Sequence, residues 1–289
     1  MMGAIYKREL KAYFTGMMGY VFVSFILLMF GIYTTAYHLN YGYPNFEVTI
    51  SSTSFIFLIA VPILTMRVFA EERKQKTDQL LYSLPIRVTD VVLGKYLAMV
   101  TLLLIPLLLV STYPVLILKN YGTISLKTAY SSIVGFFTLG CTLLAVGLFM
   151  SSLTENQIIA AVLSFGALIL SYFMKGIQGL VSSTAMASLI ALTSVAVVLC
   201  VIVRLMTKNW MAAIAAGIVA EVPLYILYSW KPALLEGVFS SGLGAMAVFD
   251  RLDNFIGGML DITSLVYYIT VALLFVFFTV QSVEKRRWS

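Results

Sequence analysis

Charged residues are scarce in this sequence. Asp, Glu, Lys and Arg make up 11% of its 289 residues, whereas 61% are hydrophobic. Soluble domains carry about 25% charged residues, so the composition excludes an ordinary water-exposed globular domain. Charge is missing altogether from residues 12–46, 96–118, 128–154, 176–203 and 262–283. Because about 20 apolar residues cross a bilayer as a helix, these stretches predict an all-α, multi-pass integral membrane protein.

Histidine, cysteine and nucleotide-binding motifs are also scarce. The single histidine, His38, has no second His or Cys near it to build a metal site, and we expect it at the lipid–water boundary. Cys141 and Cys200 fall within apolar runs and are interpreted as free, buried thiols. No G-x-x-x-x-G-K-[ST] phosphate loop occurs, so ATP hydrolysis by this chain is not expected.

One pair of residues resembles an enzyme motif. Glu71-Glu72 is similar to the start of the E-E-x-x-x-R motif of intramembrane prenyl-protein proteases. Here Lys76 replaces the arginine, and the histidines that such proteases need further along are missing. The pair also lies at the end of an apolar run, where charges are expected. No catalytic residue is therefore predicted.

The apolar runs predict eight spans within one permease-like domain, 1–289. They cover about 17–39, 52–70, 92–118, 130–151, 156–174, 183–204, 210–229 and 263–283. The first run is too long for a cleavable signal and has no A-x-A site after it. A segment at 1–16 precedes it, in which Lys7, Arg8 and Lys11 alternate with Ile5 and Leu10. This pattern is typical of a helix lying at the membrane interface.

The distribution of Lys and Arg predicts that both termini are cytoplasmic. Cytoplasmic loops carry an excess of these residues. With the N-terminus inside, 14 of the 19 Lys and Arg are cytoplasmic: 7, 8, 11, 67, 73, 74, 76, 87, 95, 204, 208, 285, 286 and 287. The other five, 119, 127, 175, 231 and 251, lie outside. The net charge of +6 thus reflects membrane topology, and no nucleic-acid partner is indicated.

Residues 71–90, EERKQKTDQLLYSLPIRVTD, form a compact polar segment between two apolar runs. Thr77 can cap a short helix, and Asp78 in its first turn favours the positive end of the helix dipole. Pro85 would stop that helix, and Thr89-Asp90 would start the next one. Leu80, Leu81 and Leu84 fall on one face, with Ser83 beside them. Such an exposed apolar ridge is either a binding surface or the lipid-facing side of an interfacial helix.

Four stretches resemble one transporter family. The run R-x-F-A-E-E-R-K-x-x-T-x-x-L-L-x-S-L-P-x with the following Gly94-Lys95 is similar to the cytoplasmic coupling loop of ABC-2-type permeases. The gliding-motility/nitrous-oxide-accessory subgroup is the most similar. I-Y-K-R-E-L-K-A-Y-F (5–14), S-S-L-T-E-N-Q-I-I-A (151–160) and F-D-R-L-D-N-F-I-G-G-M-L-D-I-T-S-L-V-Y-Y (249–268) also match family stretches. At 151–160, Thr154 and Gln157 fit a capping box between two spans.

The resemblance implies a membrane subunit of an ABC transporter. Two such chains, identical or different, would form a dimer in the lipid membrane above two cytosolic ATPase subunits that bind ATP and magnesium, and export is the commoner direction. A periplasmic or extracellular accessory protein is a further candidate partner. The resemblance places ATPase docking on the coupling loop, at Thr77, Asp78, Leu80, Leu81, Ser83, Leu84 and Pro85.

The chain departs from the family pattern of six spans. Two apolar runs within 183–229 are interpreted as a two-helix insertion, and 230–262 is expected to form short amphipathic helices on the outer side. Glu221 lies in the middle of one inserted run. A carboxyl at that depth is either functional or kept protonated by burial.

In the family the first, second and fifth spans line the transport path. Aromatic residues that could line it here are Phe25, Phe30, Tyr33 and Tyr37 in the first span and Phe55 in the second. Core packing or contact with lipid is the alternative for each.

Two other functions remain open at this point. A proton-coupled secondary transporter would need an ion-coupling group, for which only Glu221 qualifies, and no inverted repeat is evident. A membrane scaffold that pairs with an ATPase without transporting anything would show the same sequence features.

Overall fold

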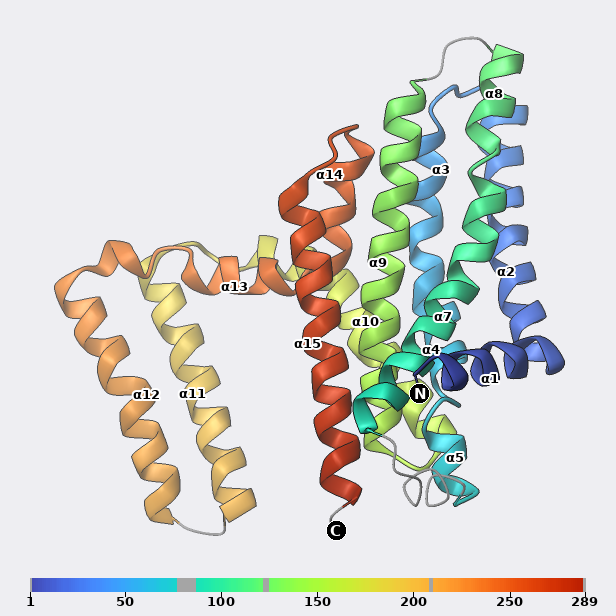
Figure 1. Cartoon of the computed structure of the whole chain (residues 1–289). Coiled ribbons are helices and arrows are strands. Elements are labelled where there is room, and N and C mark those ends of the chain that lie inside the picture. Colours follow the sequence, from blue (N-terminus) through green and yellow to red (C-terminus); the bar gives the residue numbers. More distant parts are fainter. Residues whose placement is uncertain (1, 77–86, 122–124, 208–209, 288–289) are drawn as a thin grey trace. The chain divides into compact units, whose positions relative to one another are not determined.

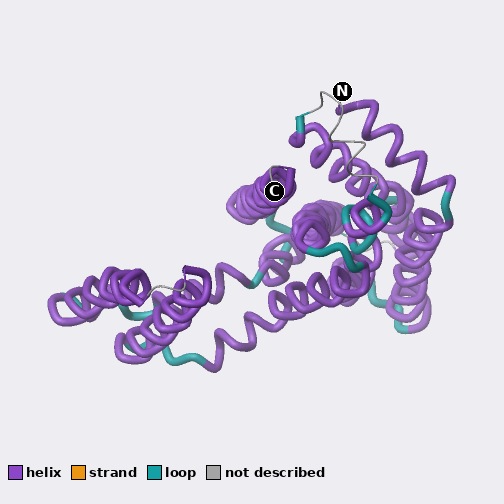
Figure 2. The backbone as a smooth tube through the Cα atoms, turned by 90° about the horizontal axis from the view of Figure 1, so that it is seen from below, coloured by secondary structure: helices purple, strands orange, loops and turns teal. Residues whose placement is uncertain are grey.

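The computed structural model describes residues 2–76, 87–121, 125–207 and 210–287. Over these residues the chain consists of helices joined by short loops, with no strand (Figures 1 and 2). It divides into two compact units: Met1–Tyr172 with Val248–Ser289, and Phe173–Ala247. The all-α, multi-pass expectation is confirmed, since several of the described helices are long and apolar enough to cross a membrane.

The number of described helices that could span a membrane is six, or up to seven. The six are Met17–Asn40, Phe46–Lys74, Val88–Ile117, Leu126–Leu153, Gln157–Leu180 and Ile262–Arg286. A seventh would combine Pro232–Met246 with Val248–Ile256 as one broken span. The prediction of eight is therefore not confirmed. The two inserted runs form helices, but their described apolar stretches, Ala185–Val198 and Gly217–Trp230, are shorter than the about 20 residues that a span needs.

The first unit contains the six long helices, except for the end of α10 from Phe173 onward, and several of them are interrupted. The first span is α2 (Met17–Thr34) followed by η1 (Thr35–Asn40), and the second is α3 (Phe46–Thr53), η2 (Ser54–Ile56) and α4 (Phe57–Thr65), continued by α5 (Ala70–Lys74). The third is α7 (Val88–Val110) with α8 (Tyr113–Tyr121). The others are α9 (Leu126–Leu153), α10 (Gln157–Leu180) and α15 (Ile262–Arg287).

Helix α9 lies at the centre of this unit. Of its most apolar window 67% is buried, against 22% for the equivalent windows of the first and last spans. Its glycines permit this packing: a Cβ on Gly140 would lie 2.5 Å from a Leu103 methyl, and one on Gly147 would lie 2.5 Å from Thr65 Oγ1. Helix α15 packs along it as well, and Thr142 Oγ1 donates to the Tyr268 carbonyl at 3.1 Å.

The amphipathic segment at the N-terminus forms α1 (Met2–Thr15), as the sequence predicts. It lies across the ends of α2 and α7 (Figure 1). A tight turn at Gly16 joins it to α2. A Cβ on Gly19 would lie only 2.6 Å from the Tyr13 carbonyl oxygen, so the start of α2 is pressed against the end of α1.

The turn between α9 and α10 is capped differently from the prediction. Asn156 Oδ1 accepts from the Ile158 backbone N–H at 2.9 Å, and Thr154 Oγ1 accepts from the Asn156 N–H at 3.2 Å. The proposed capping box of Thr154 and Gln157 is therefore wrong. Asn is as good an N-cap as Ser or Thr, and the helix starts at Gln157, directly after Asn156.

The second unit contains α11 (Ala185–Thr207), α12 (Trp210–Trp230), η3 (Pro232–Leu234) and α13 (Val238–Met246). Helices α11 and α12 pack side by side, and the Arg204 guanidinium stacks over the Trp210 ring at 4.6 Å. The rest of the segment 230–262 forms η4 (Val248–Arg251) and α14 (Leu252–Ile256), which belong to the first unit. The expected short helices are thus present.

Candidate functional site

Helix α1 is held against the third span by close packing. Gly94 on α7 faces Ile5 of α1, and a Cβ at that glycine would lie 2.9 Å from Ile5 Cγ2. The Tyr6 hydroxyl is hydrogen-bonded to Thr101 Oγ1 at 3.0 Å. These contacts place the charged residues of α1 beside Glu72 of α5 and Lys95 of α7.

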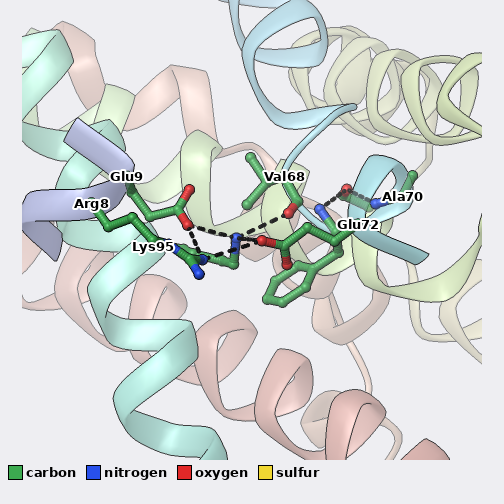
Figure 3. Close-up of polar contacts among 8 residues, drawn as sticks. Arg8, Glu9, Val68, Ala70, Glu72 and Lys95 are labelled. Atoms are coloured by element: carbon green, nitrogen blue, oxygen red, sulfur yellow. Dashed lines mark hydrogen bonds and ion pairs between the residues drawn. The ribbon is translucent and has the colours of Figure 1, made fainter. Parts of the chain in front are cut away.

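Lys95 is the centre of the charged cluster that results (Figure 3). Only 1% of its side chain is exposed. Its Nζ donates to Glu72 Oε1 at 2.8 Å, to Glu9 Oε1 at 3.1 Å and to the Val68 carbonyl at 3.3 Å. It also lies 5.5 Å from the centre of the Phe69 ring. A buried ammonium needs such partners because removing it from water is costly.

Arg8 supplies a second cation to the same carboxylates. Its Nη2 lies 2.6 Å from Glu9 Oε1 and 3.4 Å from Glu72 Oε1. Burial alone would raise the pKa of Glu9, but the combined attraction of Lys95 and Arg8 outweighs it and lowers that pKa below its usual value. Beside the cluster, Arg67 donates from Nε and Nη2 to both carboxylate oxygens of Glu71, at 2.7 and 2.8 Å. We call Arg8, Glu9, Glu72 and Lys95 the Lys95 cluster.

The same region is fixed to the central helix from the other side. Ser151 Oγ of α9 accepts from the backbone N–H groups of Phe69 and Ala70 at 3.2 and 3.4 Å. Arg73 donates from Nη1 to the Ser152 carbonyl, which also accepts from the Ser282 hydroxyl of α15 at 3.2 Å. The end of the second span is thereby joined to α1, α7, α9 and α15.

The predicted docking residues lie outside the described part of the chain. Thr77, Asp78, Leu80, Leu81, Ser83, Leu84 and Pro85 all fall within 77–86. The described residues on both sides of this segment belong to α5 and to α7, the two helices that the Lys95 cluster connects. The structure therefore shows how α5 and α7 are connected, and the docking role of the residues between them stays a prediction.

Three of the five aromatic residues proposed for the transport path lie together. The ring of Tyr33 stacks on Tyr37 with centroids 6.0 Å apart and meets Phe55 edge to face at 6.4 Å. Phe25 is half-buried in the first span. Phe30 is fully buried and packs edge to face on Phe136 of α9, 5.3 Å away. Its placement is that of a core residue.

His38 lies next to this aromatic group and is linked to it through Tyr43, whose ring meets that of Tyr37. The sequence patterns did not indicate this position of His38. It is fully buried: Nε2 is hydrogen-bonded to Thr49 Oγ1 at 3.0 Å, Nδ1 is paired with the Tyr43 carbonyl, and the ring stacks on Phe46. The ring is thus enclosed by protein, near the end of the first span, and its expected position at the lipid–water boundary stays a prediction. The residues Tyr43, Phe46 and Thr49, all within twelve positions of His38, were the available signal for a local polar pocket.

Glu221 lies in the second unit, on α12, and its side chain is exposed on that helix. The interpretation of a carboxyl buried against a neighbouring helix is thus not what this structure shows.

The charged residues of this region form a connection between helices. Among the described residues no three His, Cys, Asp or Glu side chains are grouped so that they could hold a metal ion. In the Lys95 cluster every charge faces an opposite charge from another helix. Such a cluster can transmit a displacement of one helix to the other two.

Comparison with known proteins identifies the family. The model of the ABC-2 family transporter protein matches residues 6–216, from α1 through the start of α12. No curated protein and no solved structure matches the chain. The matched region is well over half of the 289 residues. The chain therefore belongs to the ABC-2 family of transporter proteins, the membrane permease components of ABC transporters.

Proposed function

We propose that this chain is a permease subunit whose segment 71–90 docks on a separate cytosolic cassette ATPase. ATP and magnesium would bind to that partner. Two permease chains, identical or different, would form the transport path between them and move cargo outward. The motifs at 5–14, 71–90, 151–160 and 249–268 favour the gliding-motility/nitrous-oxide-accessory subgroup.

One observation supports this proposal: the Lys95 cluster connects the helices on either side of the segment 77–86. Glu72 belongs to α5 before that segment and Lys95 to α7 after it, and their side chains meet at 2.8 Å. Glu9 of α1 also contacts Lys95, with 3.1 Å between Glu9 Oε1 and Lys95 Nζ. A force applied to the segment by a partner would therefore act on α5, α7 and α1 together.

The mechanism that follows is differential binding between two conformations. Closure of an ATPase pair on ATP would displace the docked segment. The second span and α7 would then move with it, since the contacts of Ser151 and Lys95 connect them. The aromatic group of Tyr33, Tyr37 and Phe55 lies on the first and second spans, so a shift between these spans would change its packing. We place the path residues there, with Phe25 as a further candidate.

The first test is recovery of a partner ATPase. The tagged chain is purified under gentle conditions from native membranes beside a variant with Leu80→Asp and Leu81→Asp. We expect a soluble cassette ATPase with the unmodified chain and at least a tenfold loss with the variant, because two charges would disrupt an apolar docking ridge. A matched control places Asp at two exposed leucines of the outer segment, Leu234 and Leu260, and should retain the ATPase.

Two outcomes would contradict the proposal. If neither the unmodified chain nor any variant recovers an ATPase, the chain has no such partner. If the unmodified chain and both variants recover it equally, Leu80 and Leu81 are not the docking residues. Transport in vesicles separates the remaining functions. Cargo movement that needs no ATP and stops when the proton gradient collapses would establish a secondary transporter, and ATP hydrolysis that no cargo stimulates would favour a scaffold.

A further inference from the structure

A cavity of about 630 Å³ lies between α1 and the first two spans. Its walls come from α1, the start of α2, the end of α4, α5 and Lys95 of α7. This volume is within the range of about 300–1,000 Å³ that is typical of small-molecule sites. All of its lining residues belong to the first unit.

The cavity has a charged part and an apolar part. Arg8, Arg67 and Lys95 line it together with Glu9, Glu71 and Glu72, so three positive charges balance three negative ones. The apolar lining consists of Ala12, Met17, Met18, Val21, Leu64 and Val68. The apolar residues of α2 belong to the first span, which starts at Met17. The charged part therefore lies at the end of the span, where a membrane has its headgroups.

Arg8 and Arg67 each have guanidinium N–H donors that the neighbouring carboxylates do not use. Arg67 gives Nε and Nη2 to Glu71, and its side chain is 42% exposed, so Nη1 is available to a ligand. Arg8 contacts Glu9 and Glu72 through Nη2 alone and is 53% exposed. Planar guanidinium groups recognise phosphate through paired N–H donors. Glu71, which is 28% exposed, can accept from an ammonium beside the phosphate.

We propose that this cavity binds a zwitterionic phospholipid with an ammonium group, of the phosphoethanolamine class. The phosphate would lie against Arg8 and Arg67, the ammonium against Glu71, and one acyl chain along Met18, Val21 and Leu64. The balanced charge of the lining favours a zwitterion over an anionic headgroup, because the three carboxylates are already paired with the three cations and an anion would add a net negative charge. The lipid is a bound ligand and not the transported cargo, so the inference does not depend on the proposed function.

The test uses the whole chain purified in detergent and stripped of lipid. Native mass spectrometry measures the binding of short-chain phosphatidylethanolamine, phosphatidylglycerol and inorganic phosphate. We expect phosphatidylethanolamine to bind at least about tenfold more tightly than phosphatidylglycerol, which corresponds to about 1.4 kcal/mol. Inorganic phosphate alone should not displace it, because phosphate lacks the acyl chain.

Two variants locate the site. Arg67→Gln removes a guanidinium, and Leu64→Trp fills the apolar part; each should weaken phosphatidylethanolamine binding about tenfold. Arg251→Gln and Leu28→Trp are the matched controls, since neither residue lines the cavity. Thermal unfolding confirms that each variant is folded. Equal binding of phosphatidylglycerol, displacement by free phosphate, or unchanged binding in both cavity variants would each overturn the proposal.

Discussion

At the scale of single residues, Lys95 is the side chain on which the site depends. A lysine that is 1% exposed is tolerated here because Glu9 and Glu72 reach it from two other helices. Removing one member of a buried ion pair is strongly destabilising, since it leaves the partner charge without compensation. The two carboxylates are 14% and 23% exposed, so water reduces that effect.

Lys95→Met is expected to lower the free energy of unfolding by about 2–3 kcal/mol, because Arg8 alone cannot compensate both carboxylates. The measurement is thermal or denaturant unfolding of the purified chain in detergent. Lys127→Met, at an exposed position at the start of α9, is the control and should change stability by less than about 0.5 kcal/mol. Equal effects of the two changes would show that the cluster contributes nothing.

The ion pairs of Glu9 also predict a dependence on pH. Its pKa is lower in the folded chain than in the unfolded one, so it stabilises the fold above the ordinary carboxyl pKa. This contribution is lost as the pH falls through the lowered value. The unfolding temperature of Glu9→Gln should therefore lie below that of the unmodified chain near pH 7, and the two should converge in acid. A difference that stays constant down to pH 3 would contradict this assignment.

At the scale of helices and spans, the glycines of α9 decide how closely its neighbours pack. Gly147 faces Thr65 of α4, and Gly140 faces Leu103 and Phe57. These contacts bring α4 and α7 against the central helix. In contrast, a Cβ on Gly166 of α10 would meet nothing within 4 Å.

Gly147→Ala should destabilise the chain by about 1–3 kcal/mol, because the new methyl group would lie 2.5 Å from Thr65 Oγ1 and the buried threonine has no space to retreat. Gly166→Ala should leave stability unchanged or raise it by up to about 1 kcal/mol, the difference in helix propensity. Unfolding of both variants in one detergent provides the comparison. A stable Gly147→Ala chain would mean that α4 and α9 are not in close contact.

At the scale of the first unit, the two ends of the described chain lie on the same side of the bundle (Figure 1). Arg286 of α15 donates to the Leu153 carbonyl at 2.9 Å and to Glu155 at 3.2 Å, so the end of the last span meets the turn between α9 and α10. Arg73 contacts the same end of α9. The assignment of that side to the cytoplasm stays a prediction from the distribution of Lys and Arg.

Cysteine labelling tests the orientation. In a background in which Cys141 and Cys200 are replaced by Ser, Glu155→Cys should react with a membrane-impermeant maleimide only from the cytoplasmic side. Lys127→Cys, in the first turn of the same helix at its other end, should react only from outside. The reverse pattern would invert the topology, and labelling of both positions from one side would show that α9 does not span the membrane.

The sequence patterns predicted the positions of the helices along the chain better than they predicted the contacts between helices. Long runs without charge located every one of the six long helices, since a span requires apolar length and little else. The charges of α1 were interpreted as contacts with lipid, yet Glu9 faces Lys95. That pairing joins residues 86 positions apart, so no local pattern could indicate it. A lysine beyond the first turn of an otherwise apolar helix was the one available signal.

His38 and the two inserted helices also show how little a local sequence pattern says about tertiary contacts. His38 looked isolated because its partners, Thr49 and the Tyr43 carbonyl, become neighbours only after the chain turns back into the second span. The apolar runs at 183–204 and 210–229 predicted two further spans; both form helices, and their role as spans stays a prediction.

The central position of α9 also has a consequence for biosynthesis. The ribosome makes α9 long before its neighbour α15: the bond from Thr142 joins residues 126 positions apart, and the bond of Ser282 to Ser152 spans 130. Until the last helix is synthesised and inserted, the surface of α9 around Thr142 lacks the cover that α15 provides, whereas Ser152 is already contacted by Arg73. A chain whose translation stops before Ile262 would expose this surface to lipid. Such a fragment should be recognised by membrane proteases and degraded, even though five of its six long spans are complete.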